Sequence, residues 1–501
     1  MVNLKKMMSG AAIFIFMILS CTLVFADPTT VERKGSLSFM QIAESFMERH
    51  KDDDISLAAF EKKKYDGCYG NQLTPDSKAI YDTLVECIEK SKDGVSDLGV
   101  ERRTVTVFDG DGQEYSLDVD VTYIDGKTLD DVDTYITPDG LDFVFYAMMA
   151  FDYDHPEVFW LDWSNIWVWP GETYDGKVWI NIYLNEDEEN YYCDGYTSKD
   201  DVERDAAQID EILKQLHEEV KDMDVYHKLS RFNEYLVYKN EYNRILLNTS
   251  AAEQESLDGR LWKAVSAMIY GNTDLENPIN PVCEGYSRAF KILCDYENIE
   301  CVLVSGKGNG GAHMWNYVKV PDEYDSGYDG KDNGRYDENN NGKWYAIDVT
   351  WNDPVPMNYG HLSEEDAEAN IHRYFLIGSK SSEGGEDNEF DIHIPEVDEV
   401  FFTCIKDLSY PELEQEDYVY AAKPDEPDNP EKPIIMGDVN DDGSVTMEDA
   451  SYLLELVLNG QATDYHRLVG NLDTSNRNIT ATDAAFLVQM VLQEDAPSVT
   501  E

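Results

Sequence analysis

Three residues that together can support nucleophilic catalysis occur in order in the second half of the chain. Cys283, His313 and Asp348 are separated by 30 and 35 residues. Cys283 follows Pro281 and opens a segment whose apolar residues recur at helical spacing, which predicts a thiol at a helix N-terminus. The helix dipole there favours the nucleophilic thiolate. A histidine base and a carboxylate that orients it would complete a triad for attack on a carbonyl carbon.

Two strands and one helix have to bring these side chains together. Alternating residues predict strands over 313–320 and 343–349, with His313 in the first and Asp348 in the second. If these strands are antiparallel neighbours packed on the Cys283 helix, the imidazole can reach both the carboxylate and the thiol.

The same segments resemble the bacterial transglutaminase-like proteins of the papain-like superfamily. The resemblance rests on VCEGYSRAF around Cys283, HMWNYV around His313 and WYAIDVTWNDP around Asp348. It implies an α+β core in which the cysteine helix packs on an antiparallel sheet. It also implies Cys283 as nucleophile, His313 as general base and acid, and Asp348 as orienting residue, with no cofactor for catalysis. Each residue taken singly is better explained as a buried thiol, a core histidine or a strand-end aspartate.

The chemistry implied is acyl transfer on protein amide groups, as in a cysteine acyltransferase or a cysteine protease. A lysine amine as acceptor gives a cross-link, whereas water gives deamidation or peptide hydrolysis, and the residues leave these outcomes open. Two other classes also remain: a catalytically silent binding or structural component, and an accessory enzyme of plant polysaccharide degradation.

Composition limits the partners and the compartment. The chain has 501 residues and a formal net charge of −61, which argues against nucleic acid and anionic membranes as partners. Met1–Ala26 reads as a secretory signal peptide, with a lipoprotein cysteine at Cys21 as the alternative. No second long apolar stretch occurs, so we expect a secreted, extracellular protein without membrane insertion. No CxxC or HExxH motif supports a zinc site, and the cysteine pattern assigns no disulfide.

The order of segments predicts four parts after the signal peptide. We expect an N-terminal α+β region over 27–255, the catalytic core with its extension over 256–420, a Pro/Asp/Glu linker over 421–435 and a small all-α module over 436–495. Within the core, Pro321–Gly342 is an acidic insertion. A solvated loop explains it better than a calcium site.

The C-terminal module contains two loop-helix repeats with oxygen side chains at alternate positions, as calcium loops have. The ligands expected from the first loop are Asp438, Asn440, Asp442, Thr446 and Asp449. The ligands expected from the second loop are Asn471, Asp473, Ser475, Thr480 and Asp483. The second loop is one residue longer and lacks the turn glycine, so we expect weaker binding or shifted ligands there.

These repeats resemble a type I dockerin. The resemblance implies structural calcium, a cohesin domain of a scaffoldin as partner, and a place in a cellulosome at the cell surface. The positions that usually choose the cohesin correspond to Met447 and Glu448 in one repeat and to Ala481 and Thr482 in the other. Because the pairs differ, we predict one preferred docking orientation.

Overall fold

A computed structural model describes most of the chain between Leu37 and Glu494. The described residues are 37–50, 68–91, 97–108, 114–124, 138–162, 166–172, 177–184, 192–249, 257–308, 311–321, 342–353, 371–381, 393–394, 410–420, 439–440, 445–459 and 479–494. The predicted signal peptide, the linker and most of the acidic insertion lie outside them. The chain divides into two compact units, Met1–Leu236 with Glu241–Tyr418, and Val237–Asn240 with Val419–Glu501.

The N-terminal part of the larger unit is built on an antiparallel sheet. Its strands follow the order β1-β5-β6-β4-β3, and β2 also pairs with β6. Their bounds are β1 Leu37–Ser38, β2 Asp97–Leu98, β3 Glu101–Phe108, β4 Glu114–Ile124, β5 Ile166–Glu172 and β6 Val178–Leu184.

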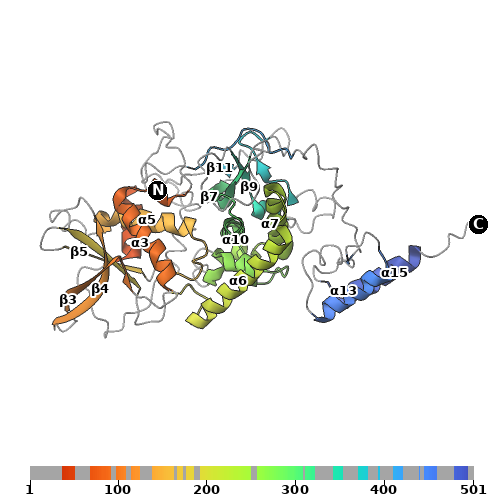
Figure 1. Cartoon of the computed structure of the whole chain (residues 1–501), viewed down its shortest axis with the longest axis horizontal. Coiled ribbons are helices and arrows are strands. Elements are labelled where there is room, and N and C mark those ends of the chain that lie inside the picture. The colour runs from red at the N-terminus through yellow and green to blue at the C-terminus, as the bar shows by residue number, and fades with distance from the viewer. Residues whose placement is uncertain are drawn as a thin grey trace, which may run out of the picture. The chain divides into compact units, whose positions relative to one another are not determined.

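Three helices pack on one face of this sheet, as the left-hand part of Figure 1 shows. They are α2 Phe39–His50, α3 Pro75–Ser91 and α5 Asp142–Asp154, with the short turns η2 Gly70–Gln72 and η3 Pro138–Leu141. Alternation along β5 and β6 directs Val168 and Ile180 toward these helices, and Trp169 and Trp179 to the opposite face. Both indoles are buried, at 8% and 4% exposure, so this aromatic stripe belongs to a core rather than to an open sugar platform.

The second sheet carries His313, and Asp348 directly follows its strand β9 instead of lying within the strand as expected, because it caps the next helix. Its order is β10-β9-β8-β7-β11, with every pair antiparallel. The bounds are β7 Cys301–Gly308, β8 Gly311–Val320, β9 Lys343–Ile347, β10 Phe375–Ile377 and β11 His393–Ile394. The mixed α+β class with antiparallel sheets is therefore confirmed, and β8 and β9 are antiparallel neighbours in the second sheet.

Helix α10 Cys283–Tyr296 packs on β7 and β8 of this sheet, near the centre of Figure 1. Tyr286, Phe290 and Leu293 recur at helical spacing and are buried, which explains the face that the helix turns inward. The short helix α11 Val349–Asn352 follows β9 directly. Between β6 and α10 the chain forms α6 Lys199–Val220, α7 Val225–Lys239, α8 Arg244–Asn248, η6 Gly259–Trp262 and η7 Ser266–Tyr270.

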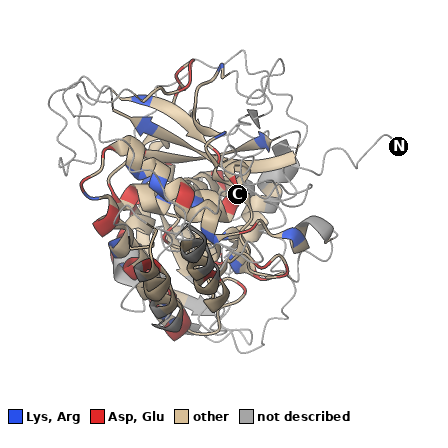
Figure 2. Cartoon of the chain, turned by 90° about the vertical axis from the view of Figure 1, so that its right-hand side faces the viewer, with Lys and Arg blue, Asp and Glu red and all other residues tan. Residues whose placement is uncertain are grey.

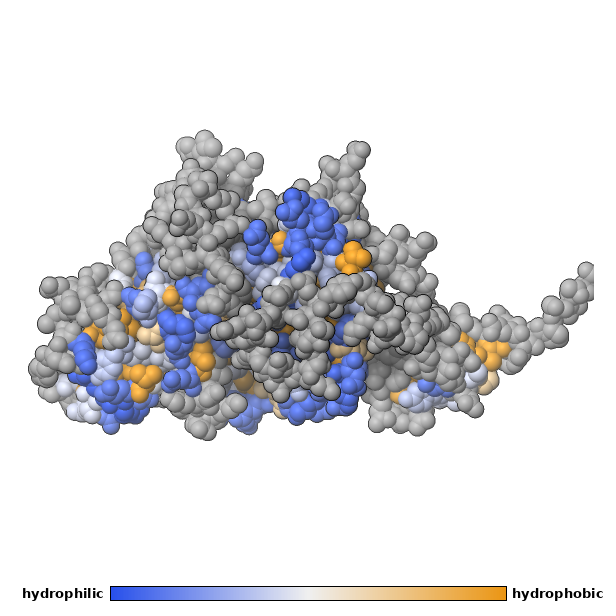
Figure 3. All heavy atoms as spheres, turned by 45° about the horizontal axis from the view of Figure 1, so that its top comes forward, coloured by the Kyte–Doolittle hydropathy of each residue, from blue (hydrophilic) through white to orange (hydrophobic). Residues whose placement is uncertain are grey.

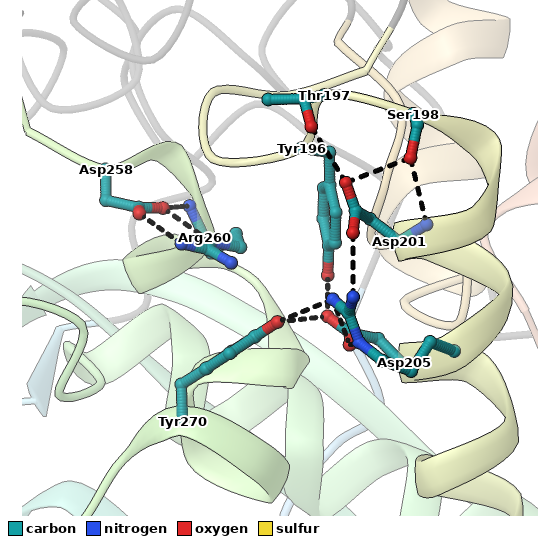
Figure 4. Close-up of polar contacts among 9 residues, drawn as sticks. Tyr196, Thr197, Ser198, Asp201, Asp205, Asp258, Arg260 and Tyr270 are labelled. Carbon is teal, nitrogen blue, oxygen red and sulfur yellow. Dashed lines mark hydrogen bonds and ion pairs between the residues drawn. The ribbon is translucent and has the colours of Figure 1, made fainter.

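A polar cluster fastens α6 to the segment that leads into α10 (Figure 4). The buried carboxylate of Asp205 accepts hydrogen bonds from the hydroxyls of Tyr196 at 2.9 Å and Tyr270 at 2.6 Å. The guanidinium of Arg260 lies 4.4 Å from the centroid of the Tyr270 ring and pairs with Asp258. Because these polar groups bond one another, the cluster is a structural tie.

Charged residues of both signs are interspersed along the described elements (Figure 2). On α6, Lys199 pairs with Glu203 and Lys214 with Asp210, each one helical turn apart. These exposed pairs show that part of the chain's many acidic side chains lies on helix faces in contact with water. Among the residues that the structure describes, no helix combines the length and the apolar character needed to cross a membrane.

The described residues after Val419 form the helices α13 Met447–Asn459 and α15 Ala481–Glu494 of the smaller unit. They pack through Leu453 and Leu487, both fully buried, with Val439 and Ala484 beside them. Apolar residues also appear among the exposed atoms of this unit, at the right of Figure 3. Among the described residues of α13, the side chains of Met447 and Leu454 are 45% and 39% exposed.

Candidate active site

Cys283 is the first residue of α10, as its sequence context predicts. Val282 before it is extended, with φ −100° and ψ 179°, so the chain enters the helix at the thiol. The side chain is half-buried, and the thiol is free. First-turn N–H groups and the helix dipole stabilise an anion at such a position.

The first turn of α10 requires glycine at position 285. A Cβ atom there would lie 2.5 Å from the hydroxyl oxygen of Ser266 and 2.9 Å from the carbonyl oxygen of Leu261. That carbonyl accepts the N–H of Val282 at 3.3 Å. The absence of a side chain at Gly285 therefore lets η6 and η7 close on the turn that carries the thiol.

The segment that enters α10 is held by Asn243. The backbone N–H of Asn243 donates to the carbonyl of Pro281 at 3.0 Å. Its side-chain amide donates to the carbonyls of Pro278 at 3.0 Å and Asn280 at 2.9 Å. Because Asn243 is itself buried, these bonds fix the path of the chain just before Cys283.

Tyr242 is a neighbour of the nucleophile that the sequence pattern did not reveal. Burial raises the pKa of its phenol well above the usual value, and the charge of Cys283 adds to the rise, whereas a hydrogen bond from the backbone of Cys283 opposes it. The hydroxyl therefore lies at Cys283 and keeps its proton at neutral pH. The two residues are 41 positions apart, so no local motif connects them.

His313 and Asp348 meet because β8 and β9 are adjacent. Asn316 of β8 lies opposite Ile347 of β9, which places Asp348 just beyond the end of that strand pair. The distance from Nε2 of His313 to Oδ2 of Asp348 is 2.6 Å, and both side chains are buried. The other oxygen of Asp348 accepts the N–H of Trp351 at 3.1 Å and thereby caps α11.

The imidazole of His313 is fixed in orientation as well as in position. Its ring stacks with Trp315 at 5.9 Å and with Trp351 at 5.2 Å between centroids. On the neighbouring strand β7, a Cβ atom at Gly308 would come within 2.8 Å of the ring. With Nε2 bonded to Asp348, the second ring nitrogen is available to Cys283, with which His313 also hydrogen-bonds.

The electrostatic surroundings keep the imidazole of His313 protonated. Burial by itself would lower its pKa, but the charge of Asp348 and the hydrogen bond to it act in the opposite direction. The hydrogen bond and charge of Cys283 add to this, and together they raise the pKa of His313 to about 10. At neutral pH the site can therefore hold an imidazolium beside the thiol, which is a proton donor next to a nucleophile.

Other residues of the three motifs lock α10 to the sheet. The hydroxyl of Tyr286 donates to Asp353 at 2.8 Å, and the hydroxyl of Ser287 donates to the carbonyl of Met314 at 2.9 Å. The side-chain amide of Asn316 donates to the carbonyl of Ser287 at 3.0 Å. These residues thus relate the position of Cys283 to the strand that bears the imidazole.

The predicted calcium loops are described only in part. Asn440, Thr446, Asp449, Thr480 and Asp483 are described, whereas Asp438, Asp442, Asn471, Asp473 and Ser475 lie outside the described residues. Among the residues described, no three carboxylate, imidazole or thiol groups gather as a metal site.

The two repeats nevertheless share one local arrangement. Oδ2 of Asp449 accepts the backbone N–H of Thr446 at 2.8 Å and its hydroxyl at 3.1 Å. Oδ2 of Asp483 accepts the same two groups of Thr480 at 2.7 Å and 2.9 Å. In the first repeat the other oxygen of Asp449 also accepts the N–H of Asn440 at 3.0 Å. Each carboxylate is fully buried, and each caps the first turn of its helix through the threonine three residues before it.

No family model matches this chain, and no curated protein matches it.

Proposed function

We propose that this protein is a secreted thiol enzyme of the transglutaminase-like family that transfers acyl groups from protein amides. The observation that carries the proposal is the 2.6 Å contact between His313 and Asp348, with the imidazole also bonded to a thiol at the first residue of a helix. Nucleophile, base and orienting group in this relation are the requirements for covalent acyl transfer.

In the first half of the reaction, the sulfur of Cys283 attacks the carbonyl carbon of a substrate amide and forms a C–S bond. The oxyanion that develops accepts a hydrogen bond from the backbone N–H of Cys283. The hydroxyl of Tyr242, which lies at this N–H, gives way to the substrate oxygen. His313 donates its proton to the nitrogen of the leaving amine, the C–N bond breaks, and a thioester remains on Cys283.

In the second half, neutral His313 takes a proton from the acceptor as the acceptor attacks the thioester carbonyl. The C–S bond then breaks, and the electron pair returns to the sulfur of Cys283. A lysine amine as acceptor gives an isopeptide cross-link. Water gives deamidation if the substrate is a glutamine side chain, and hydrolysis if it is a peptide bond. Asp348 holds the imidazole in one orientation and stabilises its charged form throughout.

A mass assay tests the proposal. The full chain is incubated with a glutamine-bearing protein and a primary amine, and the products are read by mass for amine incorporation, for a one-unit deamidation shift or for cleavage. Cys68→Ala is a matched control because Cys68 is also free and half-buried, but burial and the nearby Asp154 raise its pKa to about 12. We expect the wild type and Cys68→Ala to give product and Cys283→Ala to give none. Equal product from all three would refute the role of Cys283.

We further propose that the smaller unit is a type I dockerin that binds a cohesin domain of a scaffoldin. Support comes from the repeated bonding of Asp449 and Asp483 at the starts of α13 and α15. Buried carboxylate and hydroxyl oxygens at these loop ends are of the kind that calcium prefers. Calcium would then hold each loop against its helix, with the remaining ligands supplied by Asp438, Asn440, Asp442, Asn471, Asp473 and Ser475.

A further inference from the structure

A buried ionic network lies directly behind the residue that carries the nucleophile. Glu284, the residue after Cys283, accepts a hydrogen bond from Nε of Arg288 at 2.9 Å. The same guanidinium donates from Nη1 to the carbonyl oxygen of Asp152 at 2.8 Å and pairs through Nη2 with the carboxylate of Asp152. The side chains of Arg288 and Glu284 are 2% and 6% exposed, so the pairing is screened little by water.

The network joins two parts of the larger unit that are distant in sequence. Asp152 belongs to α5, which packs on the first sheet, whereas Glu284 and Arg288 belong to α10. Lys263, between η6 and η7, adds a weaker contact of 3.9 Å to the carboxylate of Asp152. Two carboxylates and two cations therefore balance one another within the interior.

The balance matters because Glu284 is next to the thiol. Burial raises the pKa of Glu284, while the charge of Arg288 lowers it and the charge of Asp152 raises it further. An unpaired carboxylate beside Cys283 would oppose a thiolate there. Arg288 neutralises the charge of Glu284. Its planar guanidinium also fixes the angle of the first turn of α10 against α5.

We infer that Arg288, braced by Asp152 of the N-terminal region, is a positioning residue for Cys283. The inference rests on the proposed role of Cys283 as nucleophile and extends it: the N-terminal region is part of the catalytic machinery rather than a separable neighbour. Arg288 touches no reacting atom. It acts by holding the first turn of α10 where sulfur and imidazole meet, and a misplacement of about 1 Å in such a site can cost about 100-fold in rate.

The matched control is Glu297, a buried carboxylate just past the other end of α10. It accepts hydrogen bonds from His217 at 2.6 Å and from Lys228 at 2.6 Å, which ties the far end of the helix to α6 and α7. Glu297→Gln therefore weakens the anchoring of the same helix without disturbing the surroundings of Cys283. If weaker anchoring of α10 were enough to slow the reaction of Cys283, Glu297→Gln would slow it as much as substitutions of Arg288 or Asp152.

The experiment measures the rate of Cys283 alkylation by iodoacetamide against pH in the full chain, by peptide mass, together with the melting temperature. Arg288→Lys keeps the charge but loses the fork, and Asp152→Asn keeps the shape but loses the carboxylate. We expect both to slow alkylation at pH 7 by about tenfold and to move the pH midpoint upward, and Glu297→Gln to match the wild type even if it melts earlier.

Two results would overturn the inference: wild-type alkylation profiles in Arg288→Lys and Asp152→Asn, or equal shifts in all three variants. A wild-type Cys283 that reacts no faster than Cys68 would instead refute the proposed function, so the two failures are distinguishable.

Discussion

Asp348 in the larger unit and Asp449 in the smaller one are both fully buried carboxylates that accept a backbone N–H at the start of a helix. Their remaining partners differ. Asp348 is bonded to His313, which can change its charge, whereas Asp449 is bonded to Thr446 and Asn440, which cannot. A carboxylate paired with a titratable group can support proton transfer. One surrounded by neutral donors of its own loop can cap a helix and offer charge to a cation.

The partners also differ in their distance along the chain. His313 and Asp348 are 35 residues apart and meet only through the register of β8 and β9. Thr446 and Asp449 are three residues apart, and the pair recurs as Thr480 and Asp483. The site in the larger unit therefore forms only when distant strands pair. The arrangement in the smaller unit forms between residues close in sequence, and it occurs twice.

The largest effect should come from Asp348→Asn. An amide cannot stabilise the imidazolium of His313, so we expect kcat for acyl transfer to fall by about 10³-fold. The control is Asp353→Asn, because Asp353 is also buried and accepts a hydrogen bond from the neutral hydroxyl of Tyr286. We expect that variant to lose less than about tenfold. Equal losses would mean that the charged partner of Asp348 has no special role.

The titration of His313 should also affect stability. Its pKa is raised from 6.5 to about 10, so its contribution to stability is fully present below pH 6.5 and is lost as pH rises toward 10. We expect the free energy of unfolding of the wild type to fall by about 3 to 5 kcal/mol more than that of His313→Gln over this range. Urea unfolding followed by tryptophan fluorescence at several pH values measures the difference. Parallel pH dependence in the two proteins would contradict the raised pKa.

We expect a calcium ion to be the positively charged partner of Asp449 in the smaller unit, as the imidazolium of His313 is for Asp348 in the larger unit. We expect calcium to stabilise the unfolding transition of this unit by about 1 to 3 kcal/mol at saturating concentration. Asp449→Ala and Asp483→Ala should each remove part of that gain, and chelation should leave alkylation of Cys283 unchanged. Calorimetry with and without calcium provides the measurement. A thermogram insensitive to calcium would leave the buried aspartates as helix caps alone.

The smallest effect that we expect is a difference between the two repeats of the smaller unit in their contribution to cohesin binding. Met447 and Glu448 in one repeat correspond to Ala481 and Thr482 in the other. We expect substitution of the preferred pair to weaken binding to a type I cohesin by about tenfold, and substitution of the other pair to change it by less than about threefold. Titration calorimetry against a panel of type I cohesins tests this. Equal loss from either pair would exclude a preferred orientation.

The helix and strands of the site could be predicted from the sequence more readily than the way in which they pack together. The apolar spacing after Cys283 predicts α10, and alternation predicts β8 and β9, because both patterns are local. The predicted triad requires β8 and β9 to be antiparallel neighbours, and the two strands do pair in this way. The register that sets Asn316 opposite Ile347 depends on side-chain packing across the sheet, which local periodicity does not specify.

The contacts that the sequence did not indicate are those between buried side chains far apart in the chain. Arg288 and Asp152 are 136 residues apart. Arg288 is charged and lies outside the apolar spacing of its helix, so exposure would be expected from the sequence. Its side chain is only 2% exposed. In the smaller unit Thr446 and Asp449 are only three residues apart, and the loop pattern names both as expected calcium ligands.

The most direct test of the central claim is the rate at which iodoacetamide labels each cysteine of the full-length protein at pH 7, resolved by peptide mass. We expect Cys283 to react first and much faster than Cys68, and we expect His313→Gln to remove the difference. Labelling of Cys283 no faster than that of Cys68, or unaffected by the loss of His313, would contradict it.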